Sequence, residues 1–469
     1  MLDRRRFLML SAAGAAAACS RAGDPAPKPT TEVALTAGET ELDVSGLRWR
    51  TWAYDGRLPG KEIRLRKGET LRANVTNNLP ADTSVHWHGL AIPNRMDGVP
   101  PLTQQAIAPG QRFTYEFVVP DSGTYWYHSH VGTQLDRALY GPLIVEDPTE
   151  KADYDDELVL VLDDWLDGTG TNPDKVFEQL RRTGMPSMGP TGGDAGVTPT
   201  TPLGDDGGDV TYPYYLINGR ISGDAQTVDY RTGQRIRLRI INAGSDTAFR
   251  VGVPGTKLTV THTDGYPVLL READSVILGM GERVDATITV NSSLPVVAAA
   301  ERKDGYAQLN MRVDGRPTSV DVDEFVAALR GSAPLDTATL TAAPEVQLPQ
   351  RNPDQTIDLR LAGPVTPYTW TINGKVYDPP KDGLAVKPGQ RVRIRYINES
   401  KMYHPMHLHG HTFQVTSNGR PLARKDTVLV PPLATVDTVF ETDNPGKWID
   451  HCHNTYHLES GMAVFLYYS

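Results

Sequence analysis

Residues 232–242 read TGQRIRLRIIN, and near copies of this stretch occur twice more, as KGETLRANVTN at 67–77 and PGQRVRIRYIN at 388–398. In the middle copy Ile236, Leu238 and Ile240 alternate with arginines, as in a half-buried strand that follows a glycine turn. The copies lie roughly 160 residues apart, a domain-sized spacing rather than that of a solenoid repeat. The repeat therefore predicts three related β domains.

Length and composition fit this architecture. A chain of 469 residues has room for about three domains. Its 39% hydrophobic and 22% charged residues are usual for a soluble globular protein, and the net charge of -10 argues against a nucleic-acid partner. Only short stretches such as 174–182 and 323–329 look helical, so the sequence predicts an all-β fold of sandwich domains.

The repeats divide the chain into segments. Residues 31–150, 151–320 and 345–469 are the predicted first, middle and last domains, and residues 321–344 are a predicted linker. Within the middle domain, the run 183–209 is rich in Gly, Pro, Thr and Asp and lacks a strand pattern. We expect a flexible insertion there.

Residues 1–30 are typical of an export signal followed by a tether. The run RRRFL at 4–8 resembles a twin-arginine motif, and the apolar stretch 7–18 is too short to span a bilayer. Cys19 follows three alanines in a loose lipoprotein cleavage pattern, so it is either lipidated or discarded with the signal. We expect export to the periplasm or the extracellular space, with Cys19 as a candidate lipid anchor at the membrane surface.

The histidines are clustered. Of the 12 in the chain, all but His262 fall in four groups: His86 and His88; His128 and His130; His404, His407, His409 and His411; and His451, His453 and His457. A lone His-x-His pair is usually structural, but here the segments 86–89 and 123–130 are paralleled by 407–410 and 446–453. Since residues i and i+2 of a strand share a face, two related domains that face each other could enclose several metal ions.

Cys452 lies between two of these histidines, His451 and His453, and therefore points to the opposite face of the strand. There, His404 and His457 can complete a trigonal set, with Met462 as a weak axial ligand, which is the ligand chemistry of blue copper. Zinc also accepts Cys and His. A structural zinc site, however, would not call for eight further clustered histidines.

The four clusters and the cysteine, in this order, resemble the signature of three-domain multicopper oxidases, a family that includes laccases and bacterial copper-efflux oxidases. The resemblance covers essentially the whole chain after the signal. It implies cupredoxin-like Greek-key domains, dioxygen as a substrate and four copper ions. The implied ligands are His404, Cys452, His457 and Met462 for the type 1 ion; His86 and His407 for type 2; His88, His128 and His453 for one type 3 ion; and His130, His409 and His451 for the other. His262 and His411 match no ligand position and are expected to be structural.

The resemblance also implies roles for single residues. In the family a substrate gives electrons one at a time at the type 1 copper, with His457 here as an entry point near the surface, and Cys452 connects that site to the other three ions. Asp97, which lies eleven residues after His86, matches an acidic position expected to relay protons; an Asp-Gly turn is the alternative. The family's acids three and six residues after the cysteine are Thr455 and Leu458 here, so the second proton route is left unassigned.

The sequence leaves the reductant open. Phenols or aromatic amines would need an apolar cleft over His457, whereas cuprous or ferrous ions would need carboxylates and thioethers. The 183–209 run contains Met185, Met188 and several aspartates, which could receive soft metal ions, although a solvated, flexible loop is the simpler explanation for them. We expect a monomer. The full ligand set argues against a copper-free scaffold, the shared strand against a copper-storage protein, and the third domain against a copper nitrite reductase.

Overall fold

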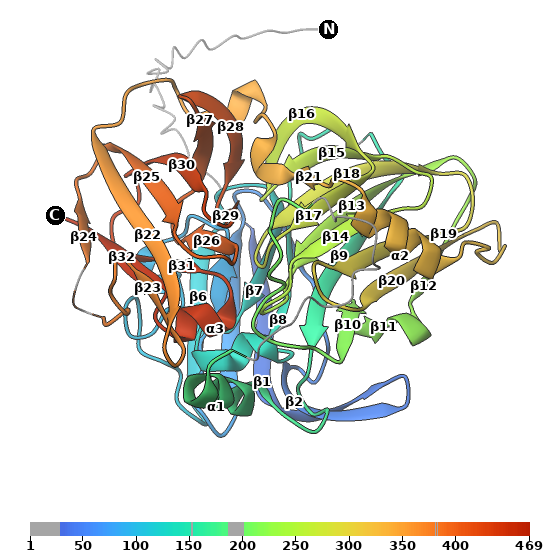
Figure 1. Cartoon of the computed structure of the whole chain (residues 1–469), viewed down its shortest axis with the longest axis horizontal. Coiled ribbons are helices and arrows are strands. Elements are labelled where there is room, and N and C mark those ends of the chain that lie inside the picture. Colours follow the sequence, from blue (N-terminus) through green and yellow to red (C-terminus); the bar gives the residue numbers. More distant parts are fainter. Residues whose placement is uncertain (1–28, 152, 186–200, 380, 382) are drawn as a thin grey trace, which may run out of the picture.

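The structure is a computed structural model that describes residues 29–151, 153–185, 201–379, 381 and 383–469. Cys19 and Met188 lie outside the described residues. The strands form six sheets, two from each third of the chain, so that three sandwiches follow one another along the sequence (Figure 1). This confirms the prediction of an all-β chain with three sandwich domains.

The first domain pairs a sheet in the order β2-β1-β4-β6 with a sheet in the order β3-β8-β7-β5. Its strands are β1 (Thr30–Val44), β2 (Leu47–Tyr54), β3 (Ile63–Arg66), β4 (Thr70–Asn78), β5 (His86–His88), β6 (Arg112–Val118), β7 (Gly123–His128) and β8 (Tyr140–Glu146).

The middle domain pairs β11-β10-β9-β13-β18-β15-β16 with β12-β20-β19-β14-β17-β21. Its strands are β9 (Asp156–Trp165), β10 (Tyr214–Ile217), β11 (Arg220–Ile221), β12 (Thr227–Tyr230), β13 (Gln234–Asn242), β14 (Phe249–Gly252), β15 (Leu258–Thr263), β16 (Tyr266–Ala273), β17 (Ser275–Leu278), β18 (Arg283–Val290), β19 (Leu294–Ala300), β20 (Tyr306–Val313) and β21 (Leu335–Asp336).

The last domain pairs β23-β22-β25-β30-β27-β28 with β24-β32-β31-β26-β29. Its strands are β22 (Gln355–Val365), β23 (Thr369–Ile372), β24 (Leu384–Val386), β25 (Arg391–Asn398), β26 (His404–Leu408), β27 (Phe413–Ser417), β28 (Arg420–Lys425), β29 (Thr427–Val430), β30 (Thr435–Glu441), β31 (Lys447–Cys452) and β32 (Ala463–Tyr468).

The three copies of the repeated stretch form β4, β13 and β25, and they hold the same place in their sandwiches. Each pairs in parallel with the first strand of its domain, β1, β9 or β22. Each also pairs antiparallel with a later strand, β6, β18 or β30. The repeat in the sequence is therefore a repeat of the fold.

The middle copy differs from the half-buried strand that its pattern predicts. In β13 Arg237 and Arg239 are each only 2% exposed, although their side chains lie opposite the apolar face. Both arginines bind Asp285 on the neighbouring β18, and β7 of the first domain packs against β13 and β18. The polar face is thus covered by another domain, where the charges are paired rather than solvated.

Helices are few among the described residues. The helix α1 (Pro173–Thr183) begins after Asn172, whose side chain accepts a hydrogen bond from the Lys175 main-chain N–H, and α2 (Val322–Gly331) begins in the same way after Asp321. Both predicted helical stretches are confirmed. The short α3 (Thr455–Glu459) directly follows β31 and contacts the first domain. No helix of the described residues is long and apolar enough to cross a membrane.

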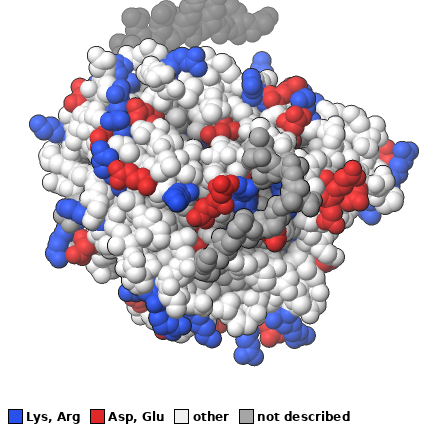
Figure 2. Space-filling view, viewed as in Figure 1, with Lys and Arg blue, Asp and Glu red and all other residues white. Residues whose placement is uncertain are grey.

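The predicted insertion 183–209 is only partly described. It starts at the end of α1, and residues 201–209 lead back into the protein, where Asp209 is 1% exposed. The predicted linker 321–344 carries α2 and β21, and β21 extends a sheet of the middle domain. On the face drawn in Figure 2, acidic and basic side chains are interspersed.

Candidate metal centre

The strand β31 is shared by two groups of side chains. It pairs with β26 so that His451 lies opposite His407 and Cys452 opposite Met406. In the first domain β5 pairs with β7, which places His86 opposite His128. Because successive side chains of a strand alternate, Cys452 points to one side of β31 and the histidines that flank it point to the other.

On the cysteine side, three side chains form what we call the cysteine site. The Cys452 Sγ lies 3.6 Å from His404 Nδ1 and 3.5 Å from His457 Nδ1, and the two nitrogens are 3.2 Å apart. Met462 is also buried, and its main-chain carbonyl accepts a hydrogen bond from the Cys452 N–H. The structure thus brings three of the four predicted type 1 ligands, His404, Cys452 and His457, together in the last domain.

On the other side, eight rings meet between the first and last domains, which we call the eight-histidine cluster: His86, His88, His128, His130, His407, His409, His451 and His453. Three sets of residues each bring one ring nitrogen per residue to within 4.8 Å of the others: His86, His88 and His128; His86, His407 and His409; and His130, His409 and His451. His453 lies between His88 and His128, with ring centroids 4.9 and 5.3 Å away. All eight predicted residues therefore converge.

Hydrogen bonds fix which ring nitrogen is free. The Nδ1–H groups of His86, His128, His407 and His451 donate to main-chain carbonyls at 2.8–2.9 Å. A carbonyl can only accept, so the Nε2 atoms of these rings carry lone pairs. The Nε2 atoms of His86, His128 and His407 are buried, and none has a hydrogen-bond partner in the part of the chain that the structure describes.

This arrangement fits metal ions. The Nε2 atoms of His409 and His451 face each other at 3.0 Å, yet the Nδ1–H of each ring already donates to an oxygen, of Asp97 and of Cys452 respectively. Two lone pairs aimed at one point repel unless a cation lies between them. Metal–imidazole bonds of about 2.0–2.1 Å place neighbouring ligand nitrogens about 3–4 Å apart, as observed here.

Burial keeps the rings neutral. Desolvation, followed by the neighbouring imidazoles, lowers the pKa of His128, His409, His451 and His453 well below the usual value. The same causes lower the pKa of His130 to about 3. A neutral imidazole is the form that coordinates a metal, so the cluster is ready to bind at neutral pH.

Asp97 lies beside the cluster. Its carboxylate accepts from the Nδ1–H of His409, with oxygens 3.1 and 3.2 Å away, and its main-chain carbonyl accepts from His86 at 2.8 Å. It also forms a turn with Gly98, at which a Cβ would collide with the Val85 carbonyl. Asp97 therefore touches two rings of the cluster and shapes the turn that holds it there.

The sequence predicted that His457 lies near the surface. In the structure it is instead 0% exposed. Its Nε2–H donates to Asp209 at 2.9 Å, and the Tyr368 hydroxyl donates to the same carboxylate. The Trp370 ring packs on His457 with centroids 3.9 Å apart. Sequence reasoning missed Asp209, which lies in the run interpreted as a flexible insertion and has no local signal.

Two further features lie around the cluster. His130 is the one ring of the eight that is not fully buried, and it lines a surface cavity of about 470 Å³ together with Tyr377 and Glu459. On the opposite side, Asp426 contacts His88 and His407.

His411 bonds to the His409 carbonyl and Tyr468, and His262 lies in the middle domain, so neither joins the cluster.

Comparison with known proteins agrees with this geometry. Family models described as multicopper oxidase match residues 36–150, 156–299 and 350–469. The chain is 44% identical over 466 residues to the multicopper oxidase MmcO of Mycobacterium tuberculosis, covering 97% of this chain and 91% of the relative. It is 28% identical to copper resistance protein A of Escherichia coli, covering 92% and 91%.

Solved structures give the same answer. The laccase from Botrytis aclada superposes with a TM-score of 0.79 at 26% identity, covering 94% of this chain and 88% of that one. The multi-copper oxidase from Pseudomonas thermotolerans gives 0.72 at 27% identity, covering 94% and 100%. The cupredoxin-like fold is thereby confirmed. The chain belongs to the multicopper oxidases, copper-dependent oxidoreductases that couple one-electron oxidation of a substrate to the four-electron reduction of dioxygen to water.

Proposed function

We propose that this oxidase holds four copper ions, one at the cysteine site and three in the eight-histidine cluster. The proposed ligands are His404, Cys452, His457 and Met462 for type 1; His86 and His407 for type 2; His88, His128 and His453 for one type 3 ion; and His130, His409 and His451 for the other. The observation that carries the proposal is β31, in which Cys452 faces one pocket and its covalent neighbours His451 and His453 face the other.

Copper bound at these positions would supply the one-electron redox chemistry. The residues supply the rest. The main chain of β31 joins the two sites through covalent bonds, buried neutral imidazoles present their lone pairs, and Asp97 orients His409. The cavity at His130 gives dioxygen a way in and water a way out. We assign proton delivery to Asp97, the carboxylate that touches the cluster from the first domain.

For the reductant we propose phenols and aromatic amines, with cuprous ion as a second candidate. Each loses one electron per step, and the electron reaches His457 across the buried shell of Asp209 and Tyr368. The negative charge of a carboxylate at this place also favours the approach of a cation. Relatives named laccase and copper resistance protein support these two classes respectively.

We further propose that the chain is exported, by the twin-arginine-type run at 4–8, to the periplasm or cell exterior, where it acts as a monomer in copper tolerance. Cys19 is a candidate lipid anchor. The names of the copper resistance relatives support the biological role.

The proposal is tested by copper analysis and absorption spectroscopy of the copper-loaded protein. We expect about four copper ions per chain and an intense band at about 600 nm, which is typical of a copper–thiolate bond. Cys452→Ser should lose the band. His411→Gln is the matched control, since His411 is clustered and buried but is not a proposed ligand and reaches the ligand His409 only at its main-chain carbonyl. It should keep both copper and colour. A colourless wild-type protein that retains little copper after reconstitution would overturn the proposal.

A further inference from the structure

The middle domain supplies none of the proposed ligands, yet one of its turns forms a wall of the eight-histidine cluster. Residues 279–282 join β17 to β18, and Gly281 has φ +85°. A Cβ at Gly281 would lie 2.8 Å from the His453 ring and 3.0 Å from that of His88. The bare main chain therefore touches one ring from the last domain and one from the first.

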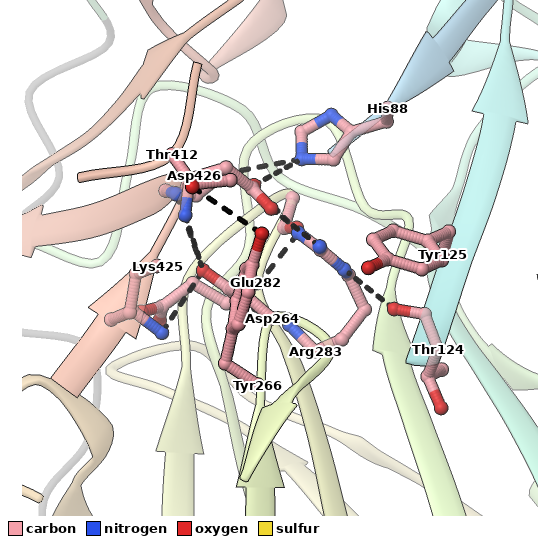
Figure 3. A network of polar contacts seen from close by, with 12 residues as sticks. His88, Thr124, Tyr125, Asp264, Tyr266, Glu282, Arg283, Thr412, Lys425 and Asp426 are labelled. Carbon is pink, nitrogen blue, oxygen red and sulfur yellow. Dashed lines mark hydrogen bonds and ion pairs between the residues drawn. The ribbon is translucent and has the colours of Figure 1, made fainter. Parts of the chain in front are cut away.

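Arg283, at the start of β18, binds all three domains to one another (Figure 3). Its guanidinium makes a two-pronged contact with Asp426 of the last domain, at 2.7 and 2.5 Å. It also donates to the Thr124 carbonyl of the first domain at 3.1 Å and to the Gly281 carbonyl at 3.0 Å. Arg283 and Asp426 are both 0% exposed.

Asp426 connects Arg283 to two histidines of the cluster through hydrogen bonds. Its carboxylate accepts from the Nε2–H of His88 at 3.1 Å, and its main-chain carbonyl accepts from the Nδ1–H of His407 at 2.9 Å. The proton of His88 is thereby held on Nε2, which leaves Nδ1 as the free atom, and that Nδ1 is buried with no hydrogen-bond partner among the described residues. Asp426 thus fixes the tautomer and the orientation of the ring.

The motif His88-Gly89 makes room for this arrangement. Gly89 has φ +88°, and a Cβ there would lie 2.4 Å from the guanidinium and 2.7 Å from the Asp426 carboxylate. A second group of charged side chains packs around Arg283 and Asp426. Asp264 accepts from the main-chain N–H groups of Arg283 and Asp426, and Lys425 lies 3.1 Å from both Asp264 and Glu282.

We propose that Arg283 and Gly281 of the middle domain are positioning residues of the eight-histidine cluster, holding Asp426, His88 and His453 in the arrangement that binds copper. The inference rests on the proposed copper sites. It gives the middle domain a defined part in the cluster, through contact with the ligands themselves. The cysteine site makes none of these contacts, so the two sites should respond differently to changes in this turn.

The first test compares Arg283→Met with Arg250→Met. Arg250 is also buried in the middle domain and also makes a two-pronged contact, with Glu301 at 3.1 and 2.9 Å, but it touches no histidine of the cluster. We measure copper per chain against a competing chelator, the copper–thiolate band and the type 2 electron paramagnetic resonance signal. Arg283→Met should keep the band but bind its cluster copper about 10- to 100-fold more weakly, whereas Arg250→Met should keep both.

A second pair of variants serves if Arg283→Met does not fold. Gly281→Ala and Gly233→Ala introduce the same Cβ at the same φ of +85°, but only Gly281 has atoms within reach, since nothing lies within 4 Å of the Cβ position at Gly233. We expect weaker cluster copper, measured against the competing chelator, for Gly281→Ala alone. Wild-type and Gly281→Ala proteins with equal copper and equal spectra would overturn this inference and leave the proposed function standing. A wild-type protein that binds no copper would overturn both.

Discussion

At the scale of single residues, Asp97 touches the cluster from both its side chain and its main chain. The carboxylate holds the Nδ1 proton of His409, and the carbonyl holds that of His86. Because a hydrogen-bonded carboxylate makes an imidazole a stronger ligand, one residue adjusts two rings that belong to different proposed copper ions.

Replacing Asp97 by Asn keeps the shape and the turn but removes the charge. We expect kcat for dioxygen consumption to fall about 10- to 100-fold, while anaerobic reduction of the type 1 band by substrate keeps its rate, since the cysteine site lies on the other side of β31. Stopped-flow absorption separates the two steps. An unchanged kcat for the Asp97→Asn protein would contradict the role in proton delivery and would leave Asp97 as a turn-forming residue only.

At the scale of elements, β13 and β18 carry a charge cluster that joins the middle domain to β7. Asp285 accepts from Arg237 at 2.6 Å and from the Thr124 hydroxyl at 2.7 Å. Burial alone would raise the pKa of Asp285, but Arg237 and Arg239 together lower it to about 2. Its ionised form therefore stabilises the folded state.

The pH dependence follows from the lowered pKa. An aspartate titrates near pH 3.9 in the unfolded chain, so the stabilisation by Asp285 is complete above that pH and is lost as pH falls through about 2. Asp285→Asn should cost about 3 kcal/mol at pH 7, with a gap to wild type that narrows between pH 4 and pH 2. Urea unfolding at several pH values measures this gap.

A control for the pH experiment is Asp229→Asn, which removes an exposed partner of Arg312. It should change the unfolding curve little at any pH, because exposed pairs contribute little to stability. If Asp285→Asn showed the same destabilisation at pH 2 and pH 7, its effect would come from packing rather than from charge.

The elements also show what a sequence can predict. The two faces of β31 follow from alternation along one strand, so the separation of Cys452 from His451 and His453 was predictable, and so were α1 and α2. The burial of Arg237 was not predictable from the sequence, because whether the polar face of a strand is covered depends on a domain far away in sequence. Asp209 meets His457 across 248 residues, and Arg283 meets Asp426 across 143. Such pairings leave no local pattern.

At the scale of the whole molecule, the eight-histidine cluster draws four rings from the first domain and four from the last. Metal bound there would tie the two domains together, and a ligand that binds only the folded state raises its stability. We therefore expect copper removal to lower the midpoint temperature of thermal unfolding. If the free metal concentration was 100 times its Kd, the lost free energy of unfolding is about 2.7 kcal/mol.

Differential scanning calorimetry of copper-loaded and chelator-treated protein measures this effect. Cys452→Ser should retain most of the stabilisation, because its cluster ligands are intact. Equal midpoints with and without copper would show that the domain interfaces alone set the stability, and would contradict the prediction.

The division of the cluster between β5 and β7 at one end of the chain and β26 and β31 at the other has a consequence for biosynthesis. His130 and His451 are 321 residues apart, so β31 leaves the ribosome long after β5 and β7. A nascent chain in which β26 and β31 are still missing therefore lacks half of the imidazoles of the cluster and also lacks Cys452. Assembly of the complete cluster has to wait until β31 has been synthesised, so a molecule truncated before β31 carries no complete redox centre.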